Sequence, residues 1–242
     1  MSGKLYALST GPGAADLITV RAARILGQLD VLYAPAGRKG GDSLALSIVR
    51  EYLGAHTEVR CCHFPMSADS AEKEAVWNDV AAALAQEVAA GRQVGFITLG
   101  DAMLFSTWVF LLARLQGRIP LEVIPGVTSF ACIAARAVFP LAMDQQTMAV
   151  VSCTAPEEEV SRALAQHDCV VLMKVYGRFP QVRALLAHHG LLGNALLMAE
   201  ASLPSEQCFR ELASLRSDVE LPYFSTILVN KQWSSILLEE VA

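Results

Sequence analysis

Short apolar runs alternate along the chain with longer stretches in which apolar residues recur at helical spacing. The runs predict strands and the stretches predict helices. In the first half, strands are expected at residues 5–9, 31–34, 57–61, 94–98 and 121–124. Helices are expected at 20–29, after Ser43, and at 71–90, 106–115 and 129–138. Because helices separate most of these strands, we expect the strands to pair in parallel.

The dipeptide Phe139-Pro140 interrupts this alternation, and residues 140–146 are the best candidate for a domain boundary. Beyond it, strands are expected at 148–152, 170–175, 195–199 and 225–229, and helices at 157–165 and 180–188. Residues 208–215 fit neither pattern clearly. The sequence therefore predicts an α/β protein of two α/β domains with a cleft between them, an N-terminal domain of residues 1–142 and a C-terminal domain of residues 143–242.

The composition raises the question of a membrane protein, because 53% of the 242 residues are apolar and the mean hydropathy is positive. The apolar runs are short, however: charged Arg114 and Lys174 close two of them well before the roughly 18–20 residues that a spanning helix needs. No apolar leader precedes the first strand. The net charge of −5, with no block of basic residues, argues against a nucleic-acid surface. We expect a soluble cytoplasmic protein with neither a membrane nor a nucleic-acid partner.

The six cysteines and five histidines do not have the spacing of a metal site. No C-x-x-C pair occurs, and Cys61-Cys62 are too close together for an ordinary zinc knuckle. His188-His189 stand at a predicted helix end, where histidines are usually structural. We therefore expect no metal ion bound by the protein's own side chains.

Three glycine-bearing segments each follow a predicted strand and precede a predicted helix: Gly11-Pro12-Gly13, Gly100-Asp101 and residues 125–129, Pro-Gly-Val-Thr-Ser. In a parallel sheet such loops all leave the carboxyl edge, where ligands bind. Taken singly, each segment also fits a plain turn or a helix cap. The first is not a dinucleotide-binding turn, because Asp16 occupies the place of the third glycine. Together the segments predict one ligand site.

In this order, the three segments resemble the tetrapyrrole methylase family, over nearly the whole chain. Members carry a G-x-G-P-G-type loop, a Gly-Asp-Pro loop and a Pro-Gly-Val-Thr-Ser-type loop. Here these read Ser9-Thr10-Gly11-Pro12-Gly13, Gly100-Asp101-Ala102 and residues 125–129. Within the family, residues 33–35, 41–45, 106–107 and 223–225 resemble the precorrin-2 or cobalt-factor II C20-methyltransferases.

The resemblance implies a homodimeric enzyme of cobalamin biosynthesis that transfers a methyl group from S-adenosyl-L-methionine to C20 of a tetrapyrrole. It also implies a cofactor held between the two domains and a tetrapyrrole groove across the rim of the first. The cofactor contacts that it implies are Pro12, Gly100, Asp101, Leu104, Thr128, Ser129, Met173, Ala201, Thr226 and Ile227.

Two departures from the family pattern matter. Ala102 replaces the usual proline, which we expect to loosen its loop. Ala34 stands where uroporphyrinogen-methylating relatives have an aspartate proposed as a base, so no catalytic residue is assigned.

A tetrapyrrole of this kind carries many carboxylates, which predicts a local basic lining in an otherwise acidic chain. Arg38 and Lys39 are the substrate-binding candidates, and the further basic candidates are Arg21, Arg136 and Lys174.

Two rival functions stay open at this point. One keeps the fold but changes the acceptor, as in diphthine synthesis or ribosomal RNA ribose methylation. The other is a non-catalytic module that binds a tetrapyrrole or S-adenosylmethionine. The sequence also leaves open whether the acceptor already holds cobalt.

Overall fold

The computed structural model describes residues 2–36, 43–64 and 70–235 of the chain. Its contacts divide the chain into two compact units, Met1–Thr128 and Ser129–Ala242. The division lies earlier than the boundary at 142/143 that the break at Phe139-Pro140 predicts. The reason is packing: Ile133 and Ala137 bury their side chains among strand residues of the second unit.

The first unit is built on a five-stranded sheet with the order β3-β2-β4-β1-β5. Its strands are β1 (Lys4–Ser9), β2 (Val31–Ala36), β3 (Glu58–His63), β4 (Gln93–Thr98) and β5 (Leu121–Ile124). β1 pairs with β4 and β5, and β2 pairs with β3 and β4, each time in parallel. The predicted parallel pairing is therefore confirmed in this unit.

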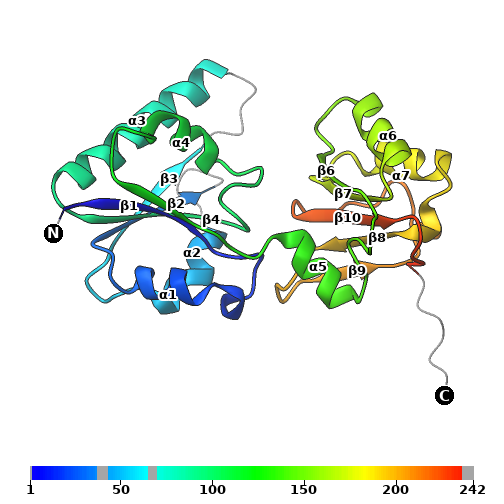
Figure 1. Cartoon of the computed structure of the whole chain (residues 1–242), viewed down its shortest axis with the longest axis horizontal. Helices are drawn as coiled ribbons and strands as arrows, with labels where there is room; N and C mark the ends of the chain where they lie inside the picture. Colours follow the sequence, from blue (N-terminus) through cyan, green and yellow to red (C-terminus); the bar gives the residue numbers. More distant parts are fainter. Residues whose placement is uncertain (1, 37–42, 65–69, 236–242) are drawn as a thin grey trace. The chain divides into compact units, whose positions relative to one another are not determined.

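Helices cover both faces of this sheet (Figure 1). α1 (Val20–Leu26) and α2 (Leu44–Val49) pack on one face with the short 3-10 turn Arg50–Tyr52, and α3 (Ser70–Ala89) and α4 (Trp108–Leu115) pack on the other. A second 3-10 turn, Ala15–Leu17, precedes α1. Ser43 caps α2 as predicted, because its side-chain oxygen accepts a hydrogen bond from the Leu46 amide at 3.3 Å.

The second unit holds a five-stranded sheet with the order β6-β7-β10-β8-β9. Its strands are β6 (Met148–Ser152), β7 (Cys169–Met173), β8 (Ala195–Ala199), β9 (Gln207–Phe209) and β10 (Ser225–Asn230). Only β6 and β7 pair in parallel; β10 lies antiparallel between β7 and β8, and β9 is antiparallel to β8. The sheet is therefore mixed, which the alternation of elements did not predict.

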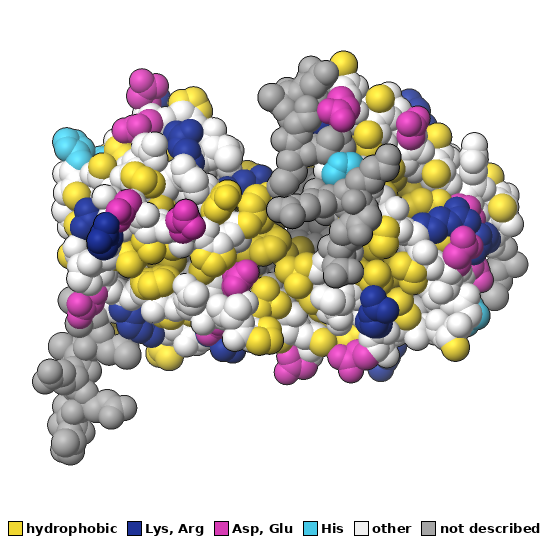
Figure 2. Space-filling view, turned by 180° about the vertical axis from the view of Figure 1, so that it is seen from behind, with side chains coloured by type: hydrophobic (Ala, Val, Ile, Leu, Met, Phe, Trp, Pro, Cys, Tyr) yellow, Lys and Arg dark blue, Asp and Glu magenta, His cyan; other side chains and the backbone are white. Residues whose placement is uncertain are grey.

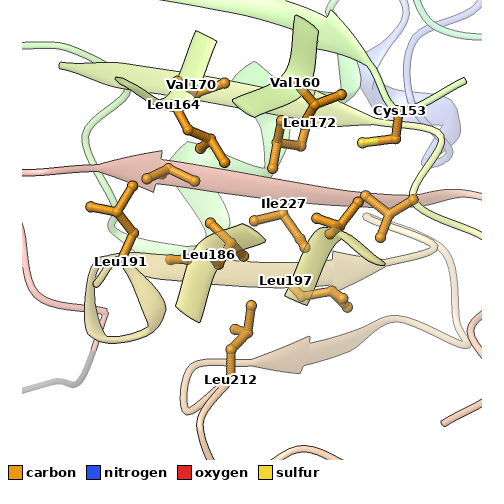
Figure 3. Packing of buried hydrophobic residues seen from close by; sticks show 14 of the residues in the cluster. Cys153, Val160, Leu164, Val170, Leu172, Leu186, Leu191, Leu197, Leu212 and Ile227 are labelled. Carbon is orange, nitrogen blue, oxygen red and sulfur yellow. The ribbon is translucent and has the colours of Figure 1, made fainter. Parts of the chain in front are cut away.

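Two hydrophobic clusters cover the faces of the second sheet. α6 (Glu157–Gln166), α7 (Phe179–His188) and the 3-10 turn Leu192–Asn194 lie over one face, where Leu164 and Leu186 pack against Leu172 and Ile227 (Figure 3). α5 (Ser129–Ala137) lies over the other face, against Leu228 and its neighbours. Each face is buried by residues that alternate along the strands.

Three further properties of the described residues concern the helices, the cysteines and the surface charge. None of their helices is long and apolar enough to cross a membrane. All six cysteines are free thiols. On the face shown in Figure 2, basic and acidic side chains are interspersed.

Candidate functional site

The first unit has a topological switch point between its neighbouring strands β1 and β4. From β1 the chain passes to α1 on one face of the sheet, and from β4 it passes to α4 on the opposite face. Where connections diverge in this way, a crevice opens at the carboxyl edge of an α/β sheet, and ligands bind there. Two of the glycine-bearing loops start at this point.

These two loops are joined through their glycine backbones. The Gly11 amide donates to the Gly100 carbonyl at 3.2 Å, and the Gly100 amide donates to the Gly11 carbonyl at 2.7 Å. Both residues have a positive φ, +77° and +70°, a conformation that glycine adopts at little cost. A Cβ atom on Gly100 would meet nothing within 4 Å, so backbone here faces open space that a ligand can approach.

Asp101 ties the third loop to the second. Its Oδ2 accepts a hydrogen bond from the Gly126 amide in the loop after β5, and its Oδ1 accepts one from the Met103 amide, both at 2.9 Å. The turn interpretation of Asp101 is thus correct in part, since the carboxylate does bond to its own loop. The expected convergence of the three loops is confirmed.

Ser9, the last residue of β1, is a part of this arrangement that the sequence did not reveal. Its Oγ accepts a hydrogen bond from the Ala102 amide at 2.9 Å, and both residues are fully buried. The sequence pattern predicts Ser9 as the last residue of a strand and assigns it no contact. The sequence signals were its place at the start of the first glycine-bearing loop and the serine in place of the first glycine of the family motif.

The other candidates of the first unit lie on the same loops. Pro12 is buried in the first loop. Leu104 is half-buried, and its amide donates to the Asp101 carbonyl at 3.3 Å. Thr128 is half-buried at the end of the unit. These candidates therefore share the carboxyl edge of the sheet with Gly100 and Asp101.

In the second unit, three candidates meet at one edge of the sheet. Met173 ends β7, Ala201 follows β8, and Thr226 lies at the start of antiparallel β10, next to Met198. Met173 and Ala201 pack into the cluster under α5, which begins at the candidate Ser129.

Ile227 points to the opposite face from Thr226, because side chains alternate along a strand. Its side chain is fully buried in the cluster under α6 and α7. Ile227 therefore has only its backbone to offer a ligand at the face that Met173 and Ala201 share.

Strained backbone marks this edge of the second sheet. Lys174 and Glu200, directly after β7 and β8, have φ values of +58° and +52°, and Ser202, two residues beyond Glu200, has a φ of +64°. For residues other than glycine this conformation costs about 1–3 kcal/mol each and is concentrated at functional sites.

Two of the predicted basic candidates are already paired. Arg21 forms an ion pair with Glu122, whose carboxylate also accepts from Lys4 Nζ at 2.7 Å. Hydrogen bonds from Lys4 and the nearby Arg21 charge lower the pKa of Glu122. Arg136 forms an ion pair with Glu206. Lys174 is exposed after β7, and Arg38 and Lys39 lie outside the described residues.

The remaining sequence candidates concern a base and a metal. Ala34 is fully buried in the cluster under α1 and α2 and brings no carboxylate to the rim. Neighbouring Tyr33 is buried too, and its hydroxyl accepts a hydrogen bond from Arg60 Nη1 at 2.9 Å. Over the described ranges, no three side chains of histidine, cysteine, aspartate or glutamate gather as metal ligands would.

The chain matches the family model of tetrapyrrole (corrin/porphyrin) methylases over residues 4–215 and belongs to that family. It is 74% identical over 233 residues to the cobalt-precorrin-2 C(20)-methyltransferase of Salmonella typhimurium, covering 96% of this chain and 98% of that protein. It is 34% identical to the precorrin-2 C(20)-methyltransferase of a Sinorhizobium species, covering 94% of this chain and 95% of that protein.

Solved structures of relatives share the fold. A cobalt precorrin-4 methyltransferase superimposes with a TM-score of 0.71 at 24% identity, covering 94% of each chain. A uroporphyrin-III C-methyltransferase from Thermus thermophilus, complexed with S-adenosylhomocysteine, superimposes with a TM-score of 0.64 at 23% identity, covering 93% of this chain and 97% of that one. The predicted two-sheet α/β class is therefore confirmed.

Proposed function

We propose that this protein is an S-adenosylmethionine-dependent methyltransferase that methylates C20 of cobalt-precorrin-2 in cobalamin biosynthesis. The observation that carries the proposal is the 74% identity to a cobalt-precorrin-2 C(20)-methyltransferase over nearly the full length of both chains. The joined glycine-bearing loops support the proposal, because they lie at the carboxyl edge of the first sheet, where α/β proteins bind ligands such as a cofactor. The same identity disfavours the two rival functions with another acceptor, diphthine synthesis and ribosomal RNA ribose methylation.

The residues at the two sheet edges suit S-adenosylmethionine. On the first unit, the proposed contacts are Pro12, Gly100, Asp101, Leu104 and Thr128, where open space over Gly100 admits a ligand to the backbone. Because both Asp101 oxygens already accept backbone hydrogen bonds, its carboxylate holds the loops in place as well. On the second unit, the proposed contacts are Ser129, Met173, Ala201, Thr226 and the backbone of Ile227.

When bound, S-adenosylmethionine supplies a methyl group activated by its positively charged sulfur. The chain's own residues then have to align the reactants and exclude water, which can contribute on the order of 7 kcal/mol or more. A bridging carbon of a reduced, conjugated tetrapyrrole is an enamine-like nucleophile, so a strong general base is not obligatory. The buried Ala34, in place of an aspartate, agrees with such a reaction.

The acceptor that we propose is the cobalt-loaded tetrapyrrole. The relative at 74% identity is named for the cobalt form and the one at 34% for the metal-free form. Cobalt would then enter the reaction as part of the substrate. We further propose that the protein is a cytoplasmic homodimer, with Arg38 and Lys39 binding substrate carboxylates.

The test is a methyl-transfer assay with the purified protein. Carbon-13-labelled S-adenosylmethionine is supplied with cobalt-precorrin-2 or with metal-free precorrin-2, and NMR locates the new methyl group. We expect a C20 methyl and faster turnover of the cobalt form. Binding of both ligands without transfer would favour a non-catalytic module, and a methyl on another carbon would overturn the proposed regiochemistry.

The additional proposals have their own measurements. Light scattering of the eluting protein should give twice the chain mass if it is a homodimer. Arg38→Ala and Lys39→Ala should each weaken binding of the tetrapyrrole. Unchanged affinity would remove those two residues from the proposal.

A further inference from the structure

Ser9 lies where the three glycine-bearing loops of the first unit meet. It ends β1, its Oγ accepts the Ala102 amide of the second loop, and its Cβ lies 2.5 Å from the place where a Cβ on Gly126 would be. Ser9 therefore contacts the second and third loops and is covalently part of the first. No solvent reaches it.

The two hydrogen-bonded residues, Ser9 and Ala102, both differ from the family's motifs as set out above. Ser9 occupies the position of the first glycine of G-x-G-P-G, and Ala102 occupies the position of the proline of Gly-Asp-Pro. A glycine has no side chain that could accept this hydrogen bond. A proline has no backbone N–H to donate it. Both partners of the bond thus exist only because both positions differ.

We infer that Ser9 is a positioning residue, which holds the Gly100-Asp101-Ala102 loop in its cofactor-binding conformation through the Ala102 amide. A proline limits a loop by fixing φ, whereas an alanine leaves φ free. The buried hydrogen bond restricts the loop again, because it holds the Ala102 amide against Ser9 Oγ. The expectation that Ala102 loosens the loop is thereby replaced: the loop is held from β1 instead. This inference rests on the proposed function.

The position of the hydrogen bond explains why its loss should weaken cofactor binding. Ala102 follows Gly100 and Asp101, which join the first and third loops. Removing the Ser9 oxygen leaves a buried N–H without a partner, which such a loop relieves by turning the peptide toward water. That turn would displace the adjoining Asp101, and with it the hydrogen bond that holds Gly126.

The test is a double-mutant cycle on the full-length protein, with S-adenosylhomocysteine as the probe and its Kd measured by calorimetry. Its variants are Ser9→Ala, Ala102→Pro and the combination of both. We expect Ser9→Ala to raise the Kd about threefold to tenfold, the range for loss of one buried hydrogen bond. In the Ala102→Pro background, where the donor is absent, the same substitution should change the Kd by less than about twofold.

Thr57→Val is the matched control. The Thr57 hydroxyl donates to the Leu29 carbonyl at 2.8 Å, a similar hydrogen bond to a backbone group, just before β3 at the amino edge of the same sheet. It should lower stability without changing the Kd. Should Ser9→Ala fold poorly, Ser9→Cys keeps the shape of the side chain, with a larger atom that is a weaker acceptor, and an intermediate Kd is expected.

The outcomes separate the two proposals. If wild-type protein does not bind S-adenosylhomocysteine, the proposed function fails. If wild type binds it and Ser9→Ala binds equally well, the inference alone fails. An equal loss of affinity in both backgrounds would also overturn it, since the effect would then not pass through the Ala102 amide.

Discussion

Gly126, in the loop after β5, has no room for a side chain. A Cβ atom there would lie 2.5 Å from Ser9 Cβ and 2.8 Å from the Gly100 carbonyl oxygen. Non-bonded carbons pack best at about 3.5–4.0 Å. Neither neighbour is the far end of a flexible side chain, so neither can swing aside. The substitution Gly126→Ala must therefore move the backbone of at least one loop.

The cost of that movement has two parts. Overpacking of a well-filled site costs about 1–3 kcal/mol. The second part falls on the hydrogen bond from the Gly126 amide to Asp101 Oδ2, 2.9 Å long; a hydrogen bond to a charged group contributes about 1.5–3 kcal/mol, and a shift weakens it only in part. We therefore expect Gly126→Ala to lower the free energy of unfolding of the first unit by about 2–4 kcal/mol.

Urea unfolding, followed by tryptophan fluorescence in a Trp233→Phe background so that the signal comes from the first unit, measures this loss, and calorimetry measures the Kd for S-adenosylhomocysteine. The matched control is Gly193→Ala in the second unit, where a Cβ would meet nothing within 4 Å and φ is not in the left-handed region. The control should leave both quantities nearly unchanged. Gly126→Ala protein that is as stable as the control and binds as tightly would refute the packing of the three loops.

Three further predictions use residues elsewhere in the chain. Thr226→Val should weaken S-adenosylhomocysteine binding, whereas Ile227→Val should lower stability by about 0.5–1.5 kcal/mol with unchanged binding, since these neighbours face opposite sides of the sheet. Calorimetry measures the binding and urea titration measures the stability. The reverse pattern would contradict the faces assigned to the two residues. Hydrogen bonds from the backbone amide and hydroxyl of Thr147 lower the pKa of Asp168 from 3.8, so the stability that they contribute is present above that pH and is lost as the pH falls through the folded-state pKa. Asp168→Asn should therefore flatten the acid side of a stability–pH curve, and an unchanged slope would exclude this role. Cys62 is half-buried, and desolvation raises the pKa of its thiol to about 12, so its alkylation at pH 8 should be slower in the folded protein than in urea; equal rates would contradict the raised pKa.

Local pattern was sufficient for most of the elements. β5, β6 and β8 have the predicted bounds 121–124, 148–152 and 195–199, because each is a short, mainly apolar segment closed by polar or turn-forming residues. The predicted start of α2 was right for a similar reason, since a capping serine acts within its own turn. Parallel pairing in the first sheet followed from the intervening helices, as the connection alone limits the direction of the next strand.

Strand order in the second sheet could not be predicted in the same way. β10 lies antiparallel between β7 and β8, although β8 and β10 are separated by β9 and a largely irregular segment rather than by a helix. Such a segment leaves the direction and the neighbours of the next strand open. The face of Ile227 could not be predicted for a related reason: in a strand buried on both faces, apolar residues do not show which face is which.

The glycines predicted which loops meet at this edge of the sheet, but not what holds these loops together. Their positions mark where backbone turns and approaches closely, a local property that a motif records. The bond from Ala102 to Ser9 joins residues 93 positions apart, and only the departure of both residues from the family motifs indicates it in the sequence. Yet this bond and the Asp101 carboxylate hold the loops through hydrogen bonds within the fold, and ordering a residue costs roughly 1–2 kcal/mol. Because the fold has already met that cost, the binding free energy of a cofactor here is available for its alignment rather than for loop closure.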